Sequence, residues 1–257
     1  MASALTLSGK HALVTGGGGG IGAAIALALA EQGAAVTICG RRLAELQASA
    51  SRHGNIHAHV ADVTDEDSLR RLYREAQATR GAFNIVVANA GATESAPAEK
   101  VSRAAWEHTI GVNLTGAFLS VQPALAGMRE RHWGRIVFIA STAGLKGYAY
   151  VAPYVAAKHG VIGLTRALAT ETVTAGITVN ALCPGFTETP MLERAVDRIV
   201  AATKRDKSET RGALAANNPQ ARFIKPEEVA AAVVWLCAGD SAAITGQAIS
   251  ISGGETW

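Results

Sequence analysis

A run of five glycines after the first apolar segment constrains the fold more than any other feature of the chain. Residues 11–15 (HALVT) are apolar and β-rich, residues 16–20 are all glycine, and residues 21–32 have a helical pattern that Gly33 is expected to end. Glycines allow positive φ and close approach of a bound group. The helix that follows offers free N–H groups to an anion such as a pyrophosphate. This order predicts a phosphate-binding turn.

Two templates fit the glycine loop, and neither is specific by itself. Gly17, Gly19 and Gly22 fit GxGxxG, whereas Thr15, Gly16, Gly20 and Gly22 fit TGxxxGxG. The alternative is a flexible turn with no ligand. No Lys-Ser/Thr pair follows the glycines, which disfavours a nucleoside triphosphate.

Strand patterns alternate with helical patterns along most of the chain. Further strands are predicted at 34–39, 55–62, 83–91, 135–141, 177–185 and 247–254, and further helices at 43–52, 65–79, 153–174 and 226–237. Such alternation predicts parallel strands joined by crossover helices. We therefore expect residues 1–257 to form a single-domain Rossmann-type doubly wound parallel sheet flanked by helices, an α/β fold. Its ligand should lie at the carboxyl ends of the strands.

One polar segment, about residues 186–225, interrupts the alternation. A connection of this length in a compact domain is usually a functional lid or else disordered. We expect a substrate loop that contains short helices. Its basic residues could favour a phosphate-bearing carrier, or they could form a solvated lid face; they are Arg194, Arg198, Lys204, Arg205, Lys207 and Arg211.

Composition excludes several classes of function. With 49% hydrophobic and 18% charged residues the chain can build a substantial core, and a net charge of +3 without a dense Lys/Arg block argues against a nucleic-acid partner. The cysteines Cys39, Cys183 and Cys237 lack metal-ligand spacing, so we predict no metal site and a reduced, cytoplasmic location. Neither a signal peptide nor an apolar run long enough to span a membrane is evident.

The end of the second predicted strand bears on the choice of cofactor. NAD-selective sites place an acidic residue there, but this chain has Gly40, Arg41 and Arg42. The planar guanidinium suits a 2′-phosphate. NADP(H) is therefore favoured. NAD(H) stays open, because both arginines could simply begin the next helix.

Three tyrosines lie within GYAYVAPYVAAKHG, residues 147–160. Tyr154 and Lys158 are four residues apart, so they share one face of a helix. An ammonium beside a phenol should lower its pKa and suit Tyr154 to general acid/base chemistry. Tyr148 and Tyr150 have no lysine at this spacing, so we expect them to form a pocket wall or to pack.

Two further residues support this pair. Ser141 ends the fifth predicted strand, at the edge where ligands bind, although it could merely cap the next turn. Asn113, in GVNLTG, could orient a water or a helix carbonyl, or it could be purely structural.

At this point the sequence resembles the short-chain dehydrogenase/reductase family, in its ordinary-length single-domain branch. The matching motifs are TGGGGGIG at 15–22, Asp62-Val63, Asn89-Ala90-Gly91, Asn113, Ser141, Tyr154-x-x-x-Lys158 and PGFTET at 184–189. The resemblance covers nearly the whole chain. One departure is Ala88, where many relatives carry an asparagine of mainly structural importance.

The resemblance implies a role for each matching residue. Tyr154 would be the general acid/base, Ser141 would hydrogen-bond the reacting oxygen, Lys158 would lower the tyrosine pKa and hold the nicotinamide ribose, and Asn113 would support a proton relay through water. Asp62 and Val63 would meet the adenine, and Asn89 to Gly91 the adenosine ribose side. The expected cofactor-binding residues are Gly16, Gly18, Gly19, Gly20, Ile21, Gly40, Arg41, Arg42, Asp62, Val63, Asn89, Ala90, Gly91, Tyr154, Lys158, Pro184, Gly185, Thr187 and Thr189.

The leading hypothesis is an NADP(H)-dependent oxidoreductase that interconverts a small-molecule ketone and a secondary alcohol. By resemblance to 3-oxoacyl-thioester reductases and related ketoreductases, one candidate substrate is a 3-oxoacyl/3-hydroxyacyl thioester. The alternatives are an NAD-dependent dehydrogenase of a small cyclic or aromatic secondary alcohol, and a non-catalytic nucleotide-sensing protein. The resemblance also implies a homotetramer.

Overall fold

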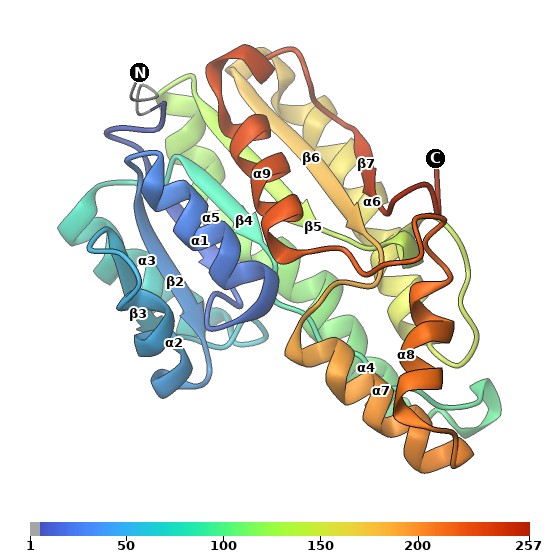
Figure 1. The fold of residues 1–257 in the computed structure, drawn as a ribbon. Coiled ribbons are helices and arrows are strands. Elements are labelled where there is room, and N and C mark those ends of the chain that lie inside the picture. Colours follow the sequence, from blue (N-terminus) through green and yellow to red (C-terminus); the bar gives the residue numbers. More distant parts are fainter. Residues whose placement is uncertain (1–5) are drawn as a thin grey trace, which may run out of the picture.

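The computed structural model describes residues 6–257 and contains a seven-stranded parallel sheet (Figure 1). The sheet order is β3-β2-β1-β4-β5-β6-β7. Strands β2 and β3 are added on one side of β1 and strands β4 to β7 on the other, so the order of strand addition reverses between β1 and β4. In doubly wound folds that reversal opens a ligand crevice at the carboxyl ends of the strands. The predicted fold class is confirmed. The strands are β1 His11–Thr15, β2 Ala35–Gly40, β3 Ile56–Val60, β4 Ile85–Ala88, β5 Gly134–Ile139, β6 Ile177–Pro184 and β7 Ala248–Ile251.

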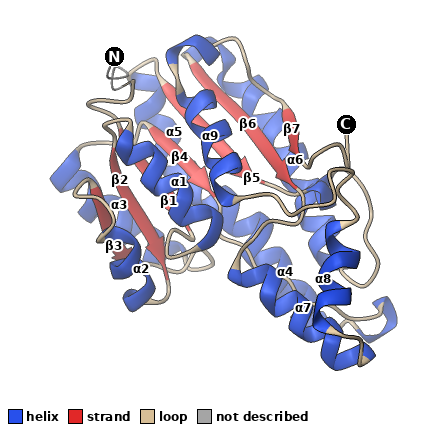
Figure 2. Cartoon of the chain, in the orientation of Figure 1, coloured by secondary structure: helices blue, strands red, loops and turns tan. Residues whose placement is uncertain are grey.

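Helices cover both faces of the sheet (Figure 2). Helices α1 and α9 pack on one face, where Val137 and Ile139 of β5 point, and α3, α5 and α6 pack on the other, where Ile136 and Phe138 point. Because both faces of the central strands are buried, those strands read as continuous apolar runs. Within residues 6–257 no helix combines the length and the apolar character that crossing a bilayer requires. The helices are α1 Gly20–Glu31, α2 Leu43–Ala50, α3 Glu66–Arg80, α4 Arg103–Ile110, α5 Gly116–Glu130, α6 Ala152–Thr172, α7 Pro190–Thr203, α8 Lys207–Ala215 and α9 Pro226–Cys237.

Local signals account for the predicted boundaries, which hold to within a few residues. Helix α1 is followed by Gly33 at φ +88°, a left-handed conformation that suits glycine. Helix α3 begins after Asp65, whose carboxylate accepts hydrogen bonds from the backbone N–H groups of Asp67 and Ser68. Helices α4 and α5 had no predicted bounds, and a π-helical segment at 111–115 joins them. Asn113 lies in that segment.

The segment at 186–225 contains α7 and α8, which project together beyond the carboxyl ends of the strands (Figure 1). Leu192, Val196 and Phe223 give it a small apolar cluster of its own. Its two ends are joined at the base by backbone hydrogen bonds from Glu188 N to Ile224 O (2.9 Å) and from Ile224 N to Phe186 O (2.9 Å). The segment is therefore folded, and α7 is longer than the short helices expected.

Candidate active site

The glycine loop between β1 and α1 forms an open cradle at a helix N-terminus. Gly16 and Gly20 have φ of +67° and +53°, and a Cβ on Gly22 would lie 2.3 Å from the carbonyl oxygen of Gly16. Only glycine fits these positions without strain. Gly19 precedes α1 without a side-chain cap, and no atom lies within 4 Å of where its Cβ would be. The first N–H groups of α1 thus face open space, which fits a dinucleotide pyrophosphate.

Asn89 clamps the end of β4 to this loop. Its side-chain amide donates hydrogen bonds to the carbonyl oxygens of Thr15 (2.8 Å) and Gly16 (3.3 Å). The Thr15 hydroxyl in turn accepts from the backbone N–H groups of Asn89 and Ala90, both at 3.0 Å. The amide of Asn89, which was predicted to face the adenosine ribose, is therefore engaged with backbone. Thr15 was not expected to hold the crevice together; its place in TGxxxGxG was the only signal.

The two arginines after β2 differ in what they contact. Arg42 donates to Glu45 (Nη2 to Oε2, 2.6 Å), three residues further along α2. Arg41 forms no ion pair within residues 6–257. Burial would raise the pKa of the nearby Asp62 carboxyl, but hydrogen bonds from Thr64 and, to a smaller extent, the charge of Arg41 lower it below its ordinary value. Arg41 is thus the arginine left free for a phosphate.

Asn113, Gly91 and Lys158 meet below the crevice. The buried Asn113 amide donates to the carbonyl oxygens of Ala92 (2.7 Å) and Thr109 (2.9 Å). A Cβ on Gly91 would lie 3.0 Å from Asn113 Oδ1 and 4.0 Å from Lys158 Nζ. The loop after β4, the π-helical segment and α6 therefore converge here, and a side chain at position 91 would press against Asn113.

Ser141 and Tyr154 are brought together, as predicted from their sequence positions. Ser141 Oγ accepts a hydrogen bond from the backbone N–H of Ala143 (3.1 Å), so it does cap the turn after β5. The same hydroxyl lies close enough to the Tyr154 phenol to lower its pKa, against the larger effect of burial. Ser141 can therefore cap the turn after β5 and still face Tyr154 in the site.

The predicted lowering of the Tyr154 pKa by Lys158 is wrong for this structure. Burial raises the pKa of Tyr154 above its ordinary value, and Ser141 offsets only part of that rise. Lys158 Nζ lies 5.5 Å from the centroid of the Tyr154 ring and donates to the carbonyl oxygen of Ile139 (2.8 Å). Burial also lowers the pKa of Lys158 to about 8. Helical spacing placed the two residues on one face but could not direct the ammonium toward the hydroxyl.

The PGFTET motif closes the other side of the crevice. Gly185 N donates to Ile251 O (3.1 Å), and the Thr187 hydroxyl donates to Gly185 O (2.9 Å). Thr189 caps α7 by accepting from Leu192 N (3.3 Å). Its methyl carbon would be 3.0 Å from a Cβ on Gly20, so the motif touches the glycine loop.

The remaining predicted cofactor residues occupy the same edge. Val63 packs its side chain against Gly116 and is buried, and Glu45 of α2 abuts Gly18. Three further predicted cofactor-binding residues lie at the ends of elements: Ile21 in the first turn of α1, Gly40 as the last residue of β2 and Pro184 as the last residue of β6.

The basic residues of the 186–225 segment are partly neutralised. Lys207 pairs with Asp197 (2.7 Å), and Arg211 pairs with Glu193. Both pairs join α8 to α7. The other four basic residues form no ion pair within residues 6–257, so a solvated lid face and a phosphate-binding surface both stay open.

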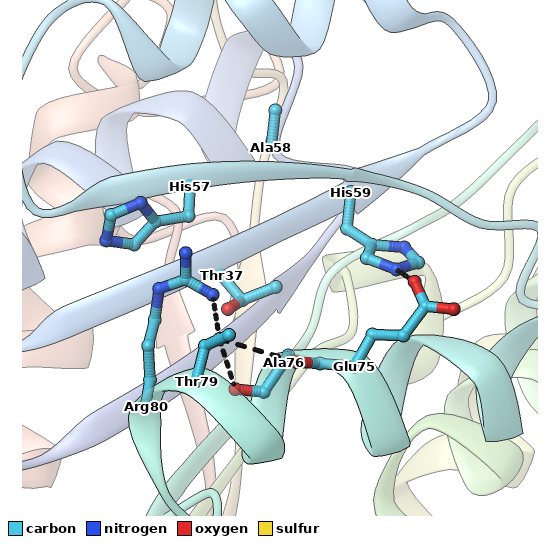
Figure 3. Close-up of a pocket in the computed structure, with 8 residues that line it drawn as sticks. All are labelled: Thr37, His57, Ala58, His59, Glu75, Ala76, Thr79 and Arg80. Carbon is cyan, nitrogen blue, oxygen red and sulfur yellow. Dashed lines mark hydrogen bonds and ion pairs between the residues drawn. The ribbon is translucent and has the colours of Figure 1, made fainter.

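A separate hollow of about 230 Å³ lies between edge strand β3 and α3 (Figure 3). His59 and Glu75 pair across it at 2.9 Å, and Arg80 donates to the Thr79 hydroxyl at 2.8 Å. None of the predicted site residues lines this hollow. The lining residues are Thr37, His57, Ala58, His59, Glu75, Ala76, Thr79 and Arg80.

Fold and site together define an α/β dinucleotide-binding oxidoreductase. The short chain dehydrogenase family matches residues 10–199, and the chain belongs to that family. Ketoacyl reductase 1 of the granaticin polyketide synthase from Streptomyces violaceoruber is 40% identical, with 95% of this chain and 92% of that protein covered. D-beta-hydroxybutyrate dehydrogenase from Cupriavidus necator is 36% identical, with 96% and 98% covered.

A solved structure gives the same result. A single-residue variant of actinorhodin polyketide ketoreductase, determined with NADPH, superposes with a TM-score of 0.94 at 35% identity, covering 98% of this chain and 99% of that one. The expected family and activity class are confirmed. The protein is an NAD(P)-dependent oxidoreductase that interconverts ketones and alcohols.

Proposed function

We propose that the protein is an NADP(H)-dependent reductase of a ketone to a secondary alcohol, with Tyr154 as general acid/base. The observation that carries this proposal is the placement of the Ser141 hydroxyl at the carboxyl end of β5, close enough to the Tyr154 phenol to lower its pKa. It lies at the sheet edge where the glycine loop presents the N-terminus of α1. The proposal treats residues 1–257 as one domain, with the 186–225 segment as its substrate loop.

The residues present suit a proton donor. When bound, the nicotinamide supplies the hydride. Because burial raises the pKa of Tyr154, the phenol holds its proton at neutral pH and can release it to an oxygen that gains negative charge. The Ser141 hydroxyl, beside that phenol, would hold the reacting oxygen. Reduction is thus the direction that this protonation state favours.

Lys158 and Asn113 have supporting roles in this proposal. Lys158 is 4% exposed and carries an ammonium whose pKa is lowered to about 8. By the family resemblance it would hold the nicotinamide ribose. Asn113 would support the proton relay through water. It lies in the π-helical segment, and such irregular helical turns are frequent at functional sites.

Arg41 supports NADP(H) over NAD(H). It stands after Gly40 at the end of β2, has no ion-pair partner within residues 6–257, and lies near Asp62. A free guanidinium at that strand end suits a 2′-phosphate. NAD(H) stays the second candidate.

For the substrate we propose a 3-oxo compound, an ester or thioester of the 3-oxoacyl class. Support comes from relatives named ketoacyl reductase and from an acetoacetyl-CoA reductase of Rhizobium meliloti, 38% identical, with 96% of this chain and 98% of that protein covered. Because Lys207 and Arg211 of the lid are already in ion pairs, a small neutral ester would also serve.

We further propose a cytoplasmic homotetramer, on the strength of the family resemblance. Trp235 of α9 is 48% exposed and Trp257 after β7 is fully exposed, which would suit burial between subunits. Light scattering on a size-exclusion column would give the mass of four chains if this is correct, and the mass of one chain if it is not.

The proposed function is tested by absorbance at 340 nm. Purified protein would be mixed with NADPH or NADH and a panel of 3-oxo esters, 3-oxo thioesters, cyclic ketones and the corresponding alcohols. We expect oxidation of NADPH with a 3-oxo ester, at a higher kcat/KM than with NADH. Cofactor binding without turnover of any substrate would instead support the nucleotide-sensing alternative.

A further inference from the structure

Glu255 brings a buried carboxylate from the C-terminal tail to the loop after β5. Its side chain is 1% exposed, and its Oε1 lies 3.0 Å from Lys146 Nζ and accepts a hydrogen bond from the Tyr148 hydroxyl. Its Oε2 is buried without a hydrogen-bond partner among the described residues and lies against Gly185, where a Cβ would be 3.0 Å away. Burying a carboxylate that is only partly satisfied is costly, so the arrangement calls for an explanation.

The carboxylate fixes the direction of the Tyr148 proton. A phenol has one proton, and here it is donated to Glu255. The Thr142 hydroxyl, 2.7 Å from the same oxygen, must then donate to Tyr148. Tyr148 can therefore offer the pocket only its one remaining lone pair, with the negative charge of Glu255 behind it. Lys146 offsets part of that charge from a position that is 39% exposed.

Tyr148 lies beside the reacting groups. Its ring packs edge-on against Phe186 (centroids 6.2 Å apart, 84° between planes), the residue that follows Gly185 at the base of the lid segment. Its partner Thr142 follows Ser141 directly. The pKa of Tyr148 is raised by burial, by Glu255 and, to a smaller extent, by the nearby Tyr154 phenol. The half-buried Tyr148 ring thus forms part of the pocket wall between Ser141 and the 186–225 segment.

We propose that Glu255 is a positioning residue that holds Tyr148 as a hydrogen-bond acceptor in the substrate pocket. The pocket would then select ketones that carry a hydrogen-bond donor, such as a hydroxyl, near the carbonyl, and would disfavour free carboxylates. This inference rests on the proposed reduction of 3-oxo compounds and adds a preference among them: a ketone with a donor near the carbonyl is reduced better than a 3-oxo ester without one. It also separates this chain from its relatives named for hydroxybutyrate, which is a carboxylate.

Three ketones of similar size test the inference. They are 4-hydroxybutan-2-one with a donor, methyl acetoacetate with neutral acceptors and acetoacetate with a carboxylate. For the wild-type protein with NADPH, we expect kcat/KM to fall in that order. If none of the three is reduced, the proposed function and this inference both fail. If they are reduced in any other order of kcat/KM, only this inference fails.

Glu255→Gln tests the direction of the hydrogen bond. A glutamine amide can donate to Tyr148 and turn its proton toward the pocket, and it also removes the charge. We expect the ratio of kcat/KM for 4-hydroxybutan-2-one over acetoacetate to fall by about tenfold or more, the scale of a hydrogen bond to a charged group. An unchanged ratio in a folded variant would overturn the proposal.

Two other variants separate orientation from charge and from simple loss of structure. Tyr148→Phe should abolish the preference for 4-hydroxybutan-2-one over methyl acetoacetate yet keep the discrimination against acetoacetate. Lys146→Met leaves the carboxylate uncompensated and should strengthen that discrimination, opposite in sign to Glu255→Gln. Thermal melts identify misfolded variants, and Tyr148→Phe provides the test if Glu255→Gln does not fold. Shifts of the same sign in Glu255→Gln and Lys146→Met, or no change in Tyr148→Phe, would contradict the proposal.

Discussion

The carboxyl edge of the sheet and the α7–α8 segment are built on different principles. At the sheet edge, Asn89, Asn113 and Lys158 are held by hydrogen bonds to backbone carbonyl groups, several of them buried. In the segment, α7 and α8 are joined by a small apolar cluster and by ion pairs with exposed members. Bonds to backbone fix positions closely, whereas exposed ion pairs contribute little stability. The difference suggests that the catalytic residues are held rigidly at the sheet edge, whereas the α7–α8 segment can adapt to a substrate.

The largest expected effect comes from the sheet edge. Tyr154→Phe removes the proton donor and should lower kcat by about 10²–10⁴-fold for every ketone, with the Kd of NADPH nearly unchanged. Tyr150→Phe is the matched control, because Tyr150 is 64% exposed and belongs to the same loop and helix region. A loss confined to some ketones would place Tyr154 in recognition instead of chemistry.

The burial of Lys158 at the sheet edge should make the free energy of unfolding depend on pH. Its pKa is about 8 in the folded protein and 10.5 ordinarily, so between these values the unfolded chain binds more protons and stability rises with pH. Relative to Lys158→Met, the wild-type free energy of unfolding should gain about 3 kcal/mol from pH 8 to pH 10.5. Urea denaturation of the ligand-free proteins measures this. Parallel pH profiles would mean that the ammonium is solvated.

Two buried valines compare the regions directly. Val137 in β5 and Val196 in α7 are both essentially inaccessible to solvent. Val137→Ala should lower the global stability by about 2 kcal/mol, because it removes packing from the main core. Val196→Ala should mainly speed hydrogen exchange in α7 and α8 and alter KM, with less change in global unfolding. Equal loss of global stability from both would show that the segment is not a separate unit.

The smallest effect is expected at Arg41. Arg41→Ala should raise the KM for NADPH by about tenfold and leave the KM for NADH unchanged, because only NADPH carries the 2′-phosphate. Arg42→Ala is the control, since Arg42 is occupied by Glu45. If Arg42→Ala has the larger effect, the two arginines exchange roles when the cofactor binds.

Local signals made most of the fold predictable. The predicted first strand coincides with β1, Asp65 caps α3 and Gly33 follows α1, because each feature depends on neighbouring residues. The π-helical segment around Asn113 was not predictable in this way. Its form depends on contacts with Ala92, 21 residues away.

The predicted site residues lie at one edge of the sheet, but the sequence did not predict how they contact one another. Motif spacing placed Ser141 and Tyr154 together, yet the raised pKa of Tyr154 comes from burial that spacing does not report. Glu255 follows the last strand and has no motif around it. It reaches Tyr148 across 107 residues of sequence, and only the folded chain brings the two together.

The most direct test of the account follows the hydride itself. Wild-type protein would be given NADPH deuterated at the transferable position of the nicotinamide C4, together with methyl acetoacetate, and the product analysed by mass spectrometry. We predict methyl 3-hydroxybutanoate with one deuterium on the carbinol carbon, and almost none of this product with Tyr154→Phe. Alcohol without deuterium, or labelled alcohol formed equally well by Tyr154→Phe, would contradict the account.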